Sequence, residues 1–302
     1  MDLRPSRREV LAGGVATAFT SVLPAGGRAF AEGTGSEEIA GQLRALEQAH
    51  SARLGVFARD TVTGRTVRYR AHELFPMCST FKTIAVAAVL RDLDHSGEFL
   101  AKLIRYTEKD VTESGYAPIT GLPDNLADGM TVAALCAAAI EYSDNTAANL
   151  LLRELGGPSA VTRFCSSTGD RVTRLDRREP DLNSAEPGRV TDTSSPIAIG
   201  RTYGRLTLGD ALEAGDRQRL TGWLLRNTTS GKRFRAGLPK DWTVADKTGT
   251  GGYGTANDVG IAWPTGRGPI VMTVLSTKHD VAAPADDSLV AGTAALLAAA
   301  LV

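Results

Sequence analysis

Residues 79–94, "STFKTIAVAAVLRDLD", mark the point at which the character of the chain changes. The segment contains no Gly or Pro and is rich in Ala, Leu and Val, as expected of a buried helix. Before it, "RLGVFARD" (53–60) and "RTVRYRA" (65–71) look like two strands joined by the turn "TVTG" (61–64). The second alternates apolar residues with Arg, as a half-buried edge strand does. The chain therefore changes from strands to helices at Ser79.

The rest of the chain continues with helices and then returns to strands. Helical patterns are "TVAALCAAAIEY" (131–142), "TAANLLLREL" (146–155), "DRQRLTGWLLRN" (216–227) and the final "SLVAGTAALLAAALV" (288–302), and strand patterns are "WTVADKTG" (242–249), "NDVGIAW" (257–263) and "PIVMTVLST" (269–277).

The simplest solution is an α/β domain plus an inserted all-helical domain. We expect one antiparallel five-stranded sheet, built from both chain ends and flanked by helices, with the active site at the junction of the two domains. Residues 32–78 and 226–302 would form the α/β domain, and residues 79–225 the helical domain, including a long loop at 176–196.

Composition narrows the class of protein. Of 302 residues, 42% are hydrophobic, enough for a packed core. The 34 acidic and 34 basic residues balance, so the chain lacks the excess positive charge expected of a nucleic-acid-binding protein. No run after residue 40 is long and apolar enough to span a bilayer. No metal-binding spacing such as His-x-His occurs, so we expect neither metal nor other cofactor, and nothing suggests more than a monomer.

The N-terminus predicts export. Arg7 and Arg8 precede a weakly apolar stretch from Val10 to Leu23, and Ala29-Phe30-Ala31 fits an A-x-A cleavage pattern. This resembles a twin-arginine signal spanning residues 1–31. A secreted or periplasmic protein without a membrane anchor would follow; the alternative is an ordinary basic tail.

Four short motifs could carry chemistry, although each also has an ordinary structural interpretation. Ser79 and Lys82 lie one helical turn apart, where a desolvated lysine can activate a serine hydroxyl, but an N-cap serine beside a surface lysine is the commoner explanation. "SDN" (143–145) contains favoured N-cap residues. "KTG" (247–249) could be a strand running into a glycine turn. Glu179, in "REPDLN" (178–183) on the long loop, is either a solvated acid or a catalytic base.

All four motifs occur in one order, and together they resemble the signature of the class A serine β-lactamases over essentially the whole mature chain. The resemblance implies that Ser79 is acylated by a β-lactam substrate, with its N–H and that of Thr250 forming an oxyanion hole. It leaves Lys82 and Glu179, the latter through a water, as competing acylation bases. It implies that Ser143 passes a proton to the lactam nitrogen. The resemblance implies substrate or water contacts for Asn145, Asn183, Lys247, Thr248, Gly249, Thr250, Arg233 and, lining the entrance, Tyr116.

The same resemblance implies further features. Arg177 and Asp192 would close the loop as an ion pair, with two unrelated surface charges as the alternative. Cys78 and Cys136 lack the partners found in some relatives, so with Cys165 they predict three free thiols. Gly251 and Gly252 would leave room beside the strand for bulky substrate side chains.

Two rival functions share the serine and lysine motifs. A penicillin-binding D-Ala-D-Ala peptidase and a non-hydrolysing β-lactam sensor both lack a deacylating carboxylate, and Glu179 argues against them. A Ser-His-Asp hydrolase is disfavoured because the chain has no Gly-x-Ser-x-Gly and its four histidines lie away from the motifs. The sequence does not determine the substrate spectrum.

Overall fold

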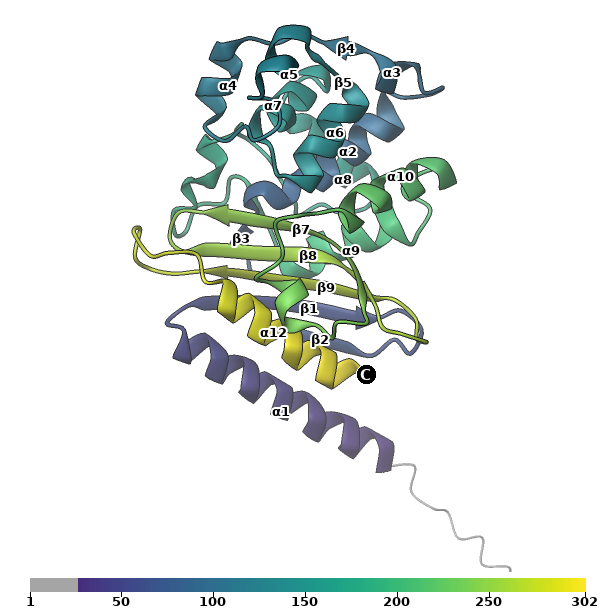
Figure 1. The fold of residues 1–302 in the computed structure, drawn as a ribbon. Helices are drawn as coiled ribbons and strands as arrows, with labels where there is room; N and C mark the ends of the chain where they lie inside the picture. The colour runs from purple at the N-terminus through teal and green to yellow at the C-terminus, as the bar shows by residue number, and fades with distance from the viewer. Residues whose placement is uncertain (1–26) are drawn as a thin grey trace, which may run out of the picture.

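The computed structural model describes the backbone of residues 27–302 and side chains from residue 37 (Figure 1). The signal predicted for residues 1–31 therefore lies mostly outside the described residues. The helices are α1 (Gly27–Ala49), α2 (Phe81–Asp92), α3 (Glu98–Ala101), α4 (Glu108–Ser114), α5 (Pro123–Asp128), α6 (Val132–Glu141), α7 (Asn145–Glu154), α8 (Ser159–Ser167), α9 (Pro196–Thr207), α10 (Ala214–Leu225), α11 (Phe234–Gly237) and α12 (Asp287–Leu301), with 3₁₀ turns η1 (Cys78–Thr80) and η2 (Asp181–Ser184).

The main sheet is antiparallel and five-stranded, as the sequence predicts. Its strand order is β2-β1-β9-β8-β7, so β9 of the C-terminal half lies beside β1 of the N-terminal half. The β1–β9 pairing runs from Arg53 opposite Thr277 to Asp60 opposite Ile270. The strands are β1 (Arg53–Asp60), β2 (Thr66–Tyr69), β7 (Thr243–Gly251), β8 (Thr255–Trp263) and β9 (Ile270–Thr277), and two small sheets pair β3 (Phe75–Pro76) with β6 (Thr193–Ser194) and β4 (Leu103–Ile104) with β5 (Met130–Thr131).

Helices cover both faces of the sheet (Figure 1). α1 and α12 lie on one face and α9 packs on the other, against β1, β8 and β9. As a result every residue of β9 is buried, which explains its continuous apolar run. The approach of α9 is close: a Cβ at Gly200 would lie 2.5 Å from the Thr273 hydroxyl and 2.7 Å from the Phe57 ring.

α2 forms the centre of the helical part, and all ten residues from Phe81 to Leu90 are buried. α6, α7, α8 and α10 pack around it. The predicted helix of residues 79–94 is therefore confirmed, with η1 as its entry. α9 lies within the predicted helical segment 79–225, yet it contacts the sheet, so the domain boundaries stay a prediction.

The nucleophile turn η1 lies where the two parts meet. It packs against β7 and β8, and the buried Tyr203 hydroxyl of α9 donates to the Thr80 carbonyl over 2.6 Å. The three cysteines are free and buried, as predicted. Within residues 27–302 we find no helix with the length and apolarity needed to cross a membrane.

Candidate active site

Ser79 is held in η1 by a tightly packed turn. Its neighbour Cys78 has a φ of 47°, and the turn presses directly against β7 at Gly249. A Cβ at Gly249 would lie 2.6 Å from the Met77 carbonyl oxygen and 3.2 Å from the Cys78 Cβ. Only glycine allows the nucleophile turn to approach the strand this closely, so Gly249 contributes to the site through its missing side chain.

Lys82 lies one turn along α2, with its side chain wholly buried. Its Nζ donates to the Ser143 carbonyl over 2.8 Å and to Asn145 Oδ1 over 2.6 Å, and it lies 3.0 Å from Glu179 Oε1. All three partners are acceptors, and an ammonium has three N–H groups to match them. Burial lowers the pKa of Lys82, while the charge of Glu179 opposes that shift.

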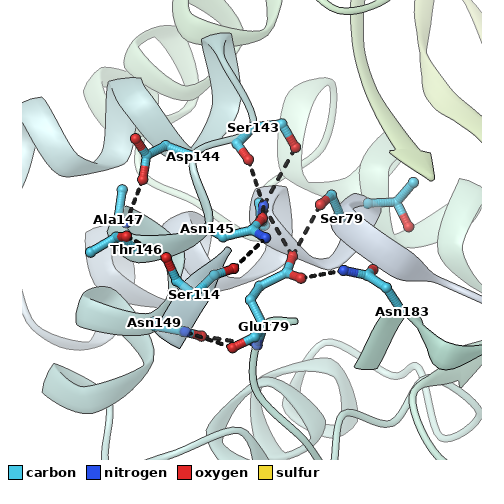
Figure 2. A network of polar contacts seen from close by, with 12 residues as sticks. Ser79, Ser114, Ser143, Asp144, Asn145, Thr146, Ala147, Asn149, Glu179 and Asn183 are labelled. Atoms are coloured by element: carbon cyan, nitrogen blue, oxygen red, sulfur yellow. Dashed lines mark hydrogen bonds and ion pairs between the residues drawn. The ribbon is translucent and has the colours of Figure 1, made fainter. Parts of the chain in front are cut away.

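Glu179 connects the loop to the nucleophile. Its Oε1 accepts the Ser79 hydroxyl over 3.0 Å, and its Oε2 accepts the Asn183 amide. The side chain is fully buried, so it is not a solvated loop acid. The sequence expectation placed a water between Ser79 and Glu179, whereas here the two side chains are in direct hydrogen-bond contact (Figure 2).

Asn149, which the sequence analysis missed, holds the backbone of Glu179. Its Oδ1 accepts the Glu179 N–H over 3.0 Å and its Nδ2 donates to the Glu179 carbonyl over 2.8 Å. The available signal was spacing, because Asn145 and Asn149 lie one turn apart on α7 and therefore share a face.

Ser143 lies between the two lysines of the site. Lys247 Nζ donates to its hydroxyl over 2.9 Å, and Lys82 Nζ lies 3.4 Å from the same oxygen. Burial, and then the nearby charge of Lys82, holds the pKa of Lys247 well below its ordinary value. Asp144, between Ser143 and Asn145, has a structural role: its carboxylate caps α7 and accepts the N–H groups of Ile119 and Thr120.

Arg233 lies behind β7, with only 5% of the residue exposed. Its guanidinium donates to Thr250 Oγ1 over 2.7 Å and to the carbonyls of Gly249 and Asn257. Its Nε donates to Asp287 Oδ1 over 2.7 Å. The sequence predicts that Arg233 binds a substrate carboxylate; in this structure it orients Thr250 and the β7 backbone. No sequence signal pointed to Asp287.

Thr248 and Tyr116, which the sequence also predicts as substrate contacts, lie at the periphery of the candidate site. Thr248 is buried on β7, and its hydroxyl contacts that of Thr229 over 2.5 Å. Tyr116 is 52% exposed, and its carbonyl accepts the Asn145 N–H over 2.8 Å. Neither geometry by itself assigns a substrate contact.

Arg177 and Asp192 form an ion pair across the base of the loop. Arg177 Nε donates to Asp192 Oδ2 over 2.6 Å, and Asp192 Oδ1 accepts the N–H groups of Asp176 and Arg177. The Asp192 side chain is 1% exposed and that of Arg177 is 25% exposed. The alternative of two unrelated surface charges does not fit this arrangement.

The interpretation of Gly251 and Gly252 was wrong. A Cβ at Gly251 would lie 2.7 Å from the Asn183 carbonyl oxygen, and one at Gly252 would lie 2.7 Å from that of Ser184. The Gly252 N–H donates to the Asn183 carbonyl over 2.8 Å. These glycines therefore let the loop approach β7, and protein atoms occupy the position that a side chain would take at each.

The described part of the chain has no group of three or more His, Cys, Asp or Glu side chains placed to hold a metal ion. The site instead presents one hydroxyl nucleophile with a carboxylate in contact with it. Two buried ammonium groups flank a second hydroxyl nearby.

Known proteins are similar to the chain over most of its length. The sequence model described as the beta-lactamase enzyme family matches residues 38–301. A beta-lactamase of Streptomyces lavendulae is 66% identical over 298 residues, covering 99% of this chain and 98% of that protein. The solved beta-lactamase from Streptomyces albus G is 65% identical with a TM-score of 0.87, covering 88% of this chain and all of the other. An ancestral (GNCA) class A beta-lactamase is 52% identical with a TM-score of 0.82, covering 87% of this chain and all of the other.

We expect Asp192→Asn to loosen the loop. An amide offers one acceptor oxygen where the carboxylate satisfies three donors, and losing hydrogen bonds to a buried charge costs about 1–3 kcal/mol. Urea unfolding and hydrogen exchange of the amides of residues 176–192 measure this. Arg174→Ala is the control, because it removes an exposed ion pair with Asp176 on the same loop that is worth less than about 1 kcal/mol. Unchanged exchange in Asp192→Asn would show that the pair does not hold the loop.

Proposed function

Because this chain belongs to the beta-lactamase enzyme family and is a class A serine β-lactamase, we propose that it hydrolyses penicillins and cephalosporins through an ester on Ser79, which Glu179 then helps to cleave. The observation that carries this mechanism is the contact of the Ser79 hydroxyl with a buried carboxylate oxygen of Glu179 over 3.0 Å, beside the Lys82 ammonium.

In acylation, Ser79 Oγ attacks the lactam carbonyl carbon as its proton moves to a base. Glu179 is the better candidate in the resting site, because it already accepts that proton's hydrogen bond. Lys82 has all three N–H groups directed at acceptors, so as an ammonium it has no lone pair to offer. Its charge stabilises the carboxylate and the negative charge that develops on the substrate.

The lactam C–N bond then breaks, and the nitrogen needs a proton. Ser143 supplies it from its hydroxyl, to which Lys82 and Lys247 both lie close, and Lys82 returns a proton to Ser143. Lys82 then takes up the proton that Glu179 received from Ser79, across their 3.0 Å contact, so Glu179 is a carboxylate again before deacylation. The backbone N–H groups of Ser79 and Thr250 would hold the carbonyl oxygen. Asn145 keeps one amide proton for the substrate side chain, because its other one goes to the Ser114 carbonyl.

Deacylation requires a water to attack the ester. Glu179 takes a proton from this water, and Asn183, bonded to the same carboxylate, helps to place it. The bond from carbonyl carbon to Ser79 Oγ breaks, and the proton returns to Ser79. Lys247, Thr248 and Thr250 would bind the substrate carboxylate, with Arg233 acting through Thr250.

We also propose that the protein is exported by the twin-arginine route and acts as a monomer, with no nucleic-acid or membrane partner.

Glu179→Ala should trap the acyl-enzyme. Without the charge and hydrogen bond of Glu179, burial lowers the pKa of Lys82 further, which favours the neutral amine that can replace the acylation base. The deacylating water has no such replacement, and a positioned base contributes about 10²–10⁴ in rate. A penicillin adduct on Ser79 should therefore persist, as intact mass spectrometry would reveal.

Glu186→Ala provides the matched control, because Glu186 is a partly exposed acid on the same loop. It should turn over a chromogenic cephalosporin as the parent does. Normal turnover by Glu179→Ala, or a folded variant that is never labelled, would contradict the mechanism. A parent protein that gives only one burst would indicate a sensor or a penicillin-binding peptidase.

Lys247→Arg should move the alkaline limit of substrate binding to higher pH. The depressed pKa of Lys247 means that its ammonium is lost as pH rises through that value, and attraction for a carboxylate falls with it. The KM of the parent protein should therefore begin to rise at a pH below the one at which an exposed lysine would lose its charge. An arginine stays charged throughout. Profiles of KM against pH for the two proteins test this. If KM rises at the same alkaline pH in both proteins, Lys247 does not bind the substrate carboxylate, whatever the absolute activity of the variant.

A further inference from the structure

We propose that Asn257 is a positioning residue that sets the spacing of the oxyanion hole between Ser79 and Thr250. The inference rests on the proposed function, since it assumes that the backbone N–H groups of these two residues receive the developing negative charge. Asn257 lies on β8, outside every sequence motif, and it touches neither the nucleophile's hydroxyl nor the base.

The Asn257 side chain ties the segment before the nucleophile to the sheet. It is fully buried, and its Nδ2 donates to the Pro76 carbonyl over 2.8 Å and to the Met77 carbonyl over 3.1 Å. Its Oδ1 accepts the Ser276 N–H of β9 over 3.2 Å. A backbone N–H only donates and carbonyls only accept, so both ends of the amide have fixed orientations.

The Met77 carbonyl accepts hydrogen bonds from both the nucleophile turn and Asn257, so it connects the two. Besides Asn257, it accepts the Thr80 hydroxyl over 2.8 Å and the Thr80 N–H over 3.3 Å. Met77 is followed by Cys78, with its positive φ, and then by Ser79. A shift of this carbonyl must therefore carry the Ser79 N–H with it.

The other donor of the hole lies on β7, which Asn257 also helps to place. In the pairing of β7 with β8, Asn257 lies opposite Gly249, and Gly249 is the residue directly before Thr250. Arg233 Nη1 bridges the carbonyls of Gly249 and Asn257 over 2.7 and 2.8 Å. Asn257 thus bonds to the turn through its side-chain amide and is linked to β7 through its backbone, while the missing Cβ of Gly249 leaves room for the turn.

A purely structural Asn257 and a positioning Asn257 differ in what they change. The first would affect the free energy of unfolding only. The second would also weaken binding of the transition state, because an oxyanion hole acts only when its donors lie about 2.7–3.1 Å from the oxyanion. Affinity for a boronic acid separates the two, since boron bonded to Ser79 Oγ becomes tetrahedral and anionic like the transition state.

The test is Asn257→Asp, which keeps the size of the side chain and an acceptor for Ser276. Its second oxygen would face two carbonyl oxygens instead of donating to them, and the turn should shift. Removing a whole oxyanion donor costs about 10²–10³ in kcat. We therefore expect a roughly 10- to 100-fold fall in the acylation rate constant for penicillin, with a parallel loss of affinity for a phenylboronic acid. Should this variant not fold, Asn257→Ser, whose hydroxyl is too short to span both carbonyls, should show the same parallel losses.

Asn125→Asp is the matched control, because the Asn125 amide also donates to a backbone carbonyl, that of Ile119, over 2.9 Å. It should change thermal stability without changing either rate or boronate affinity. If the Asn257 variants lose stability but keep the parent's boronate affinity, Asn257 is only structural and this inference is overturned. If the parent itself is neither acylated by penicillin nor inhibited by the boronic acid, the proposed function fails, and this inference fails with it.

Discussion

The buried contact between Lys82 and Glu179 is the interaction on which the rest of the site depends. Both side chains are fully buried and lie 3.0 Å apart. Removing charges from water is expensive, and a buried pair persists only if its remaining hydrogen-bonding capacity is also satisfied. Here the Ser143 carbonyl and Asn145 Oδ1 accept the remaining hydrogen bonds of the Lys82 ammonium. The Asn183 amide and the Ser79 hydroxyl donate the remaining hydrogen bonds to the Glu179 carboxylate. The nucleophile is thus part of the arrangement that makes the ion pair tolerable.

The fold can be understood as the means of bringing these groups together from distant parts of the chain. α2 supplies Lys82 from its buried first turn, the break before α7 supplies Ser143, and α7 begins with Asn145. The loop supplies Glu179, and the Arg177–Asp192 ion pair holds its base while Asn149 holds the backbone at Glu179. Each attachment restricts a group that must stay within a fraction of an ångström to act. Because the pieces come from different elements, loosening any one of them should disturb the charge balance of the others.

The sequence predicted the sheet and the main helices because their apolar periodicities are strong. It also singled out Ser79, Lys82, Ser143 and Glu179, whose side chains the structure brings together, since they lie at or close to the ends of elements, where local patterns are visible. It did not reveal Asn149, Asn257 or Asp287, whose partners are backbone groups or distant side chains brought near only by folding. The error at Gly251 and Gly252 has the same origin. A glycine marks a place where something comes close, but the sequence alone does not say whether that is a ligand or, as here, a loop of the same chain.

The direct test of the account is the position of the protons in the resting site. Neutron diffraction from crystals of the deuterium-exchanged protein would locate them on Lys82, Ser79 and Glu179. We expect three deuterons on Lys82 Nζ, a Ser79 deuteron directed at Glu179 Oε1, and none on the Glu179 carboxylate. A deuteron on Glu179, with only two on Lys82 Nζ, would contradict the proposed mechanism, because the carboxylate could then not serve as the base in acylation.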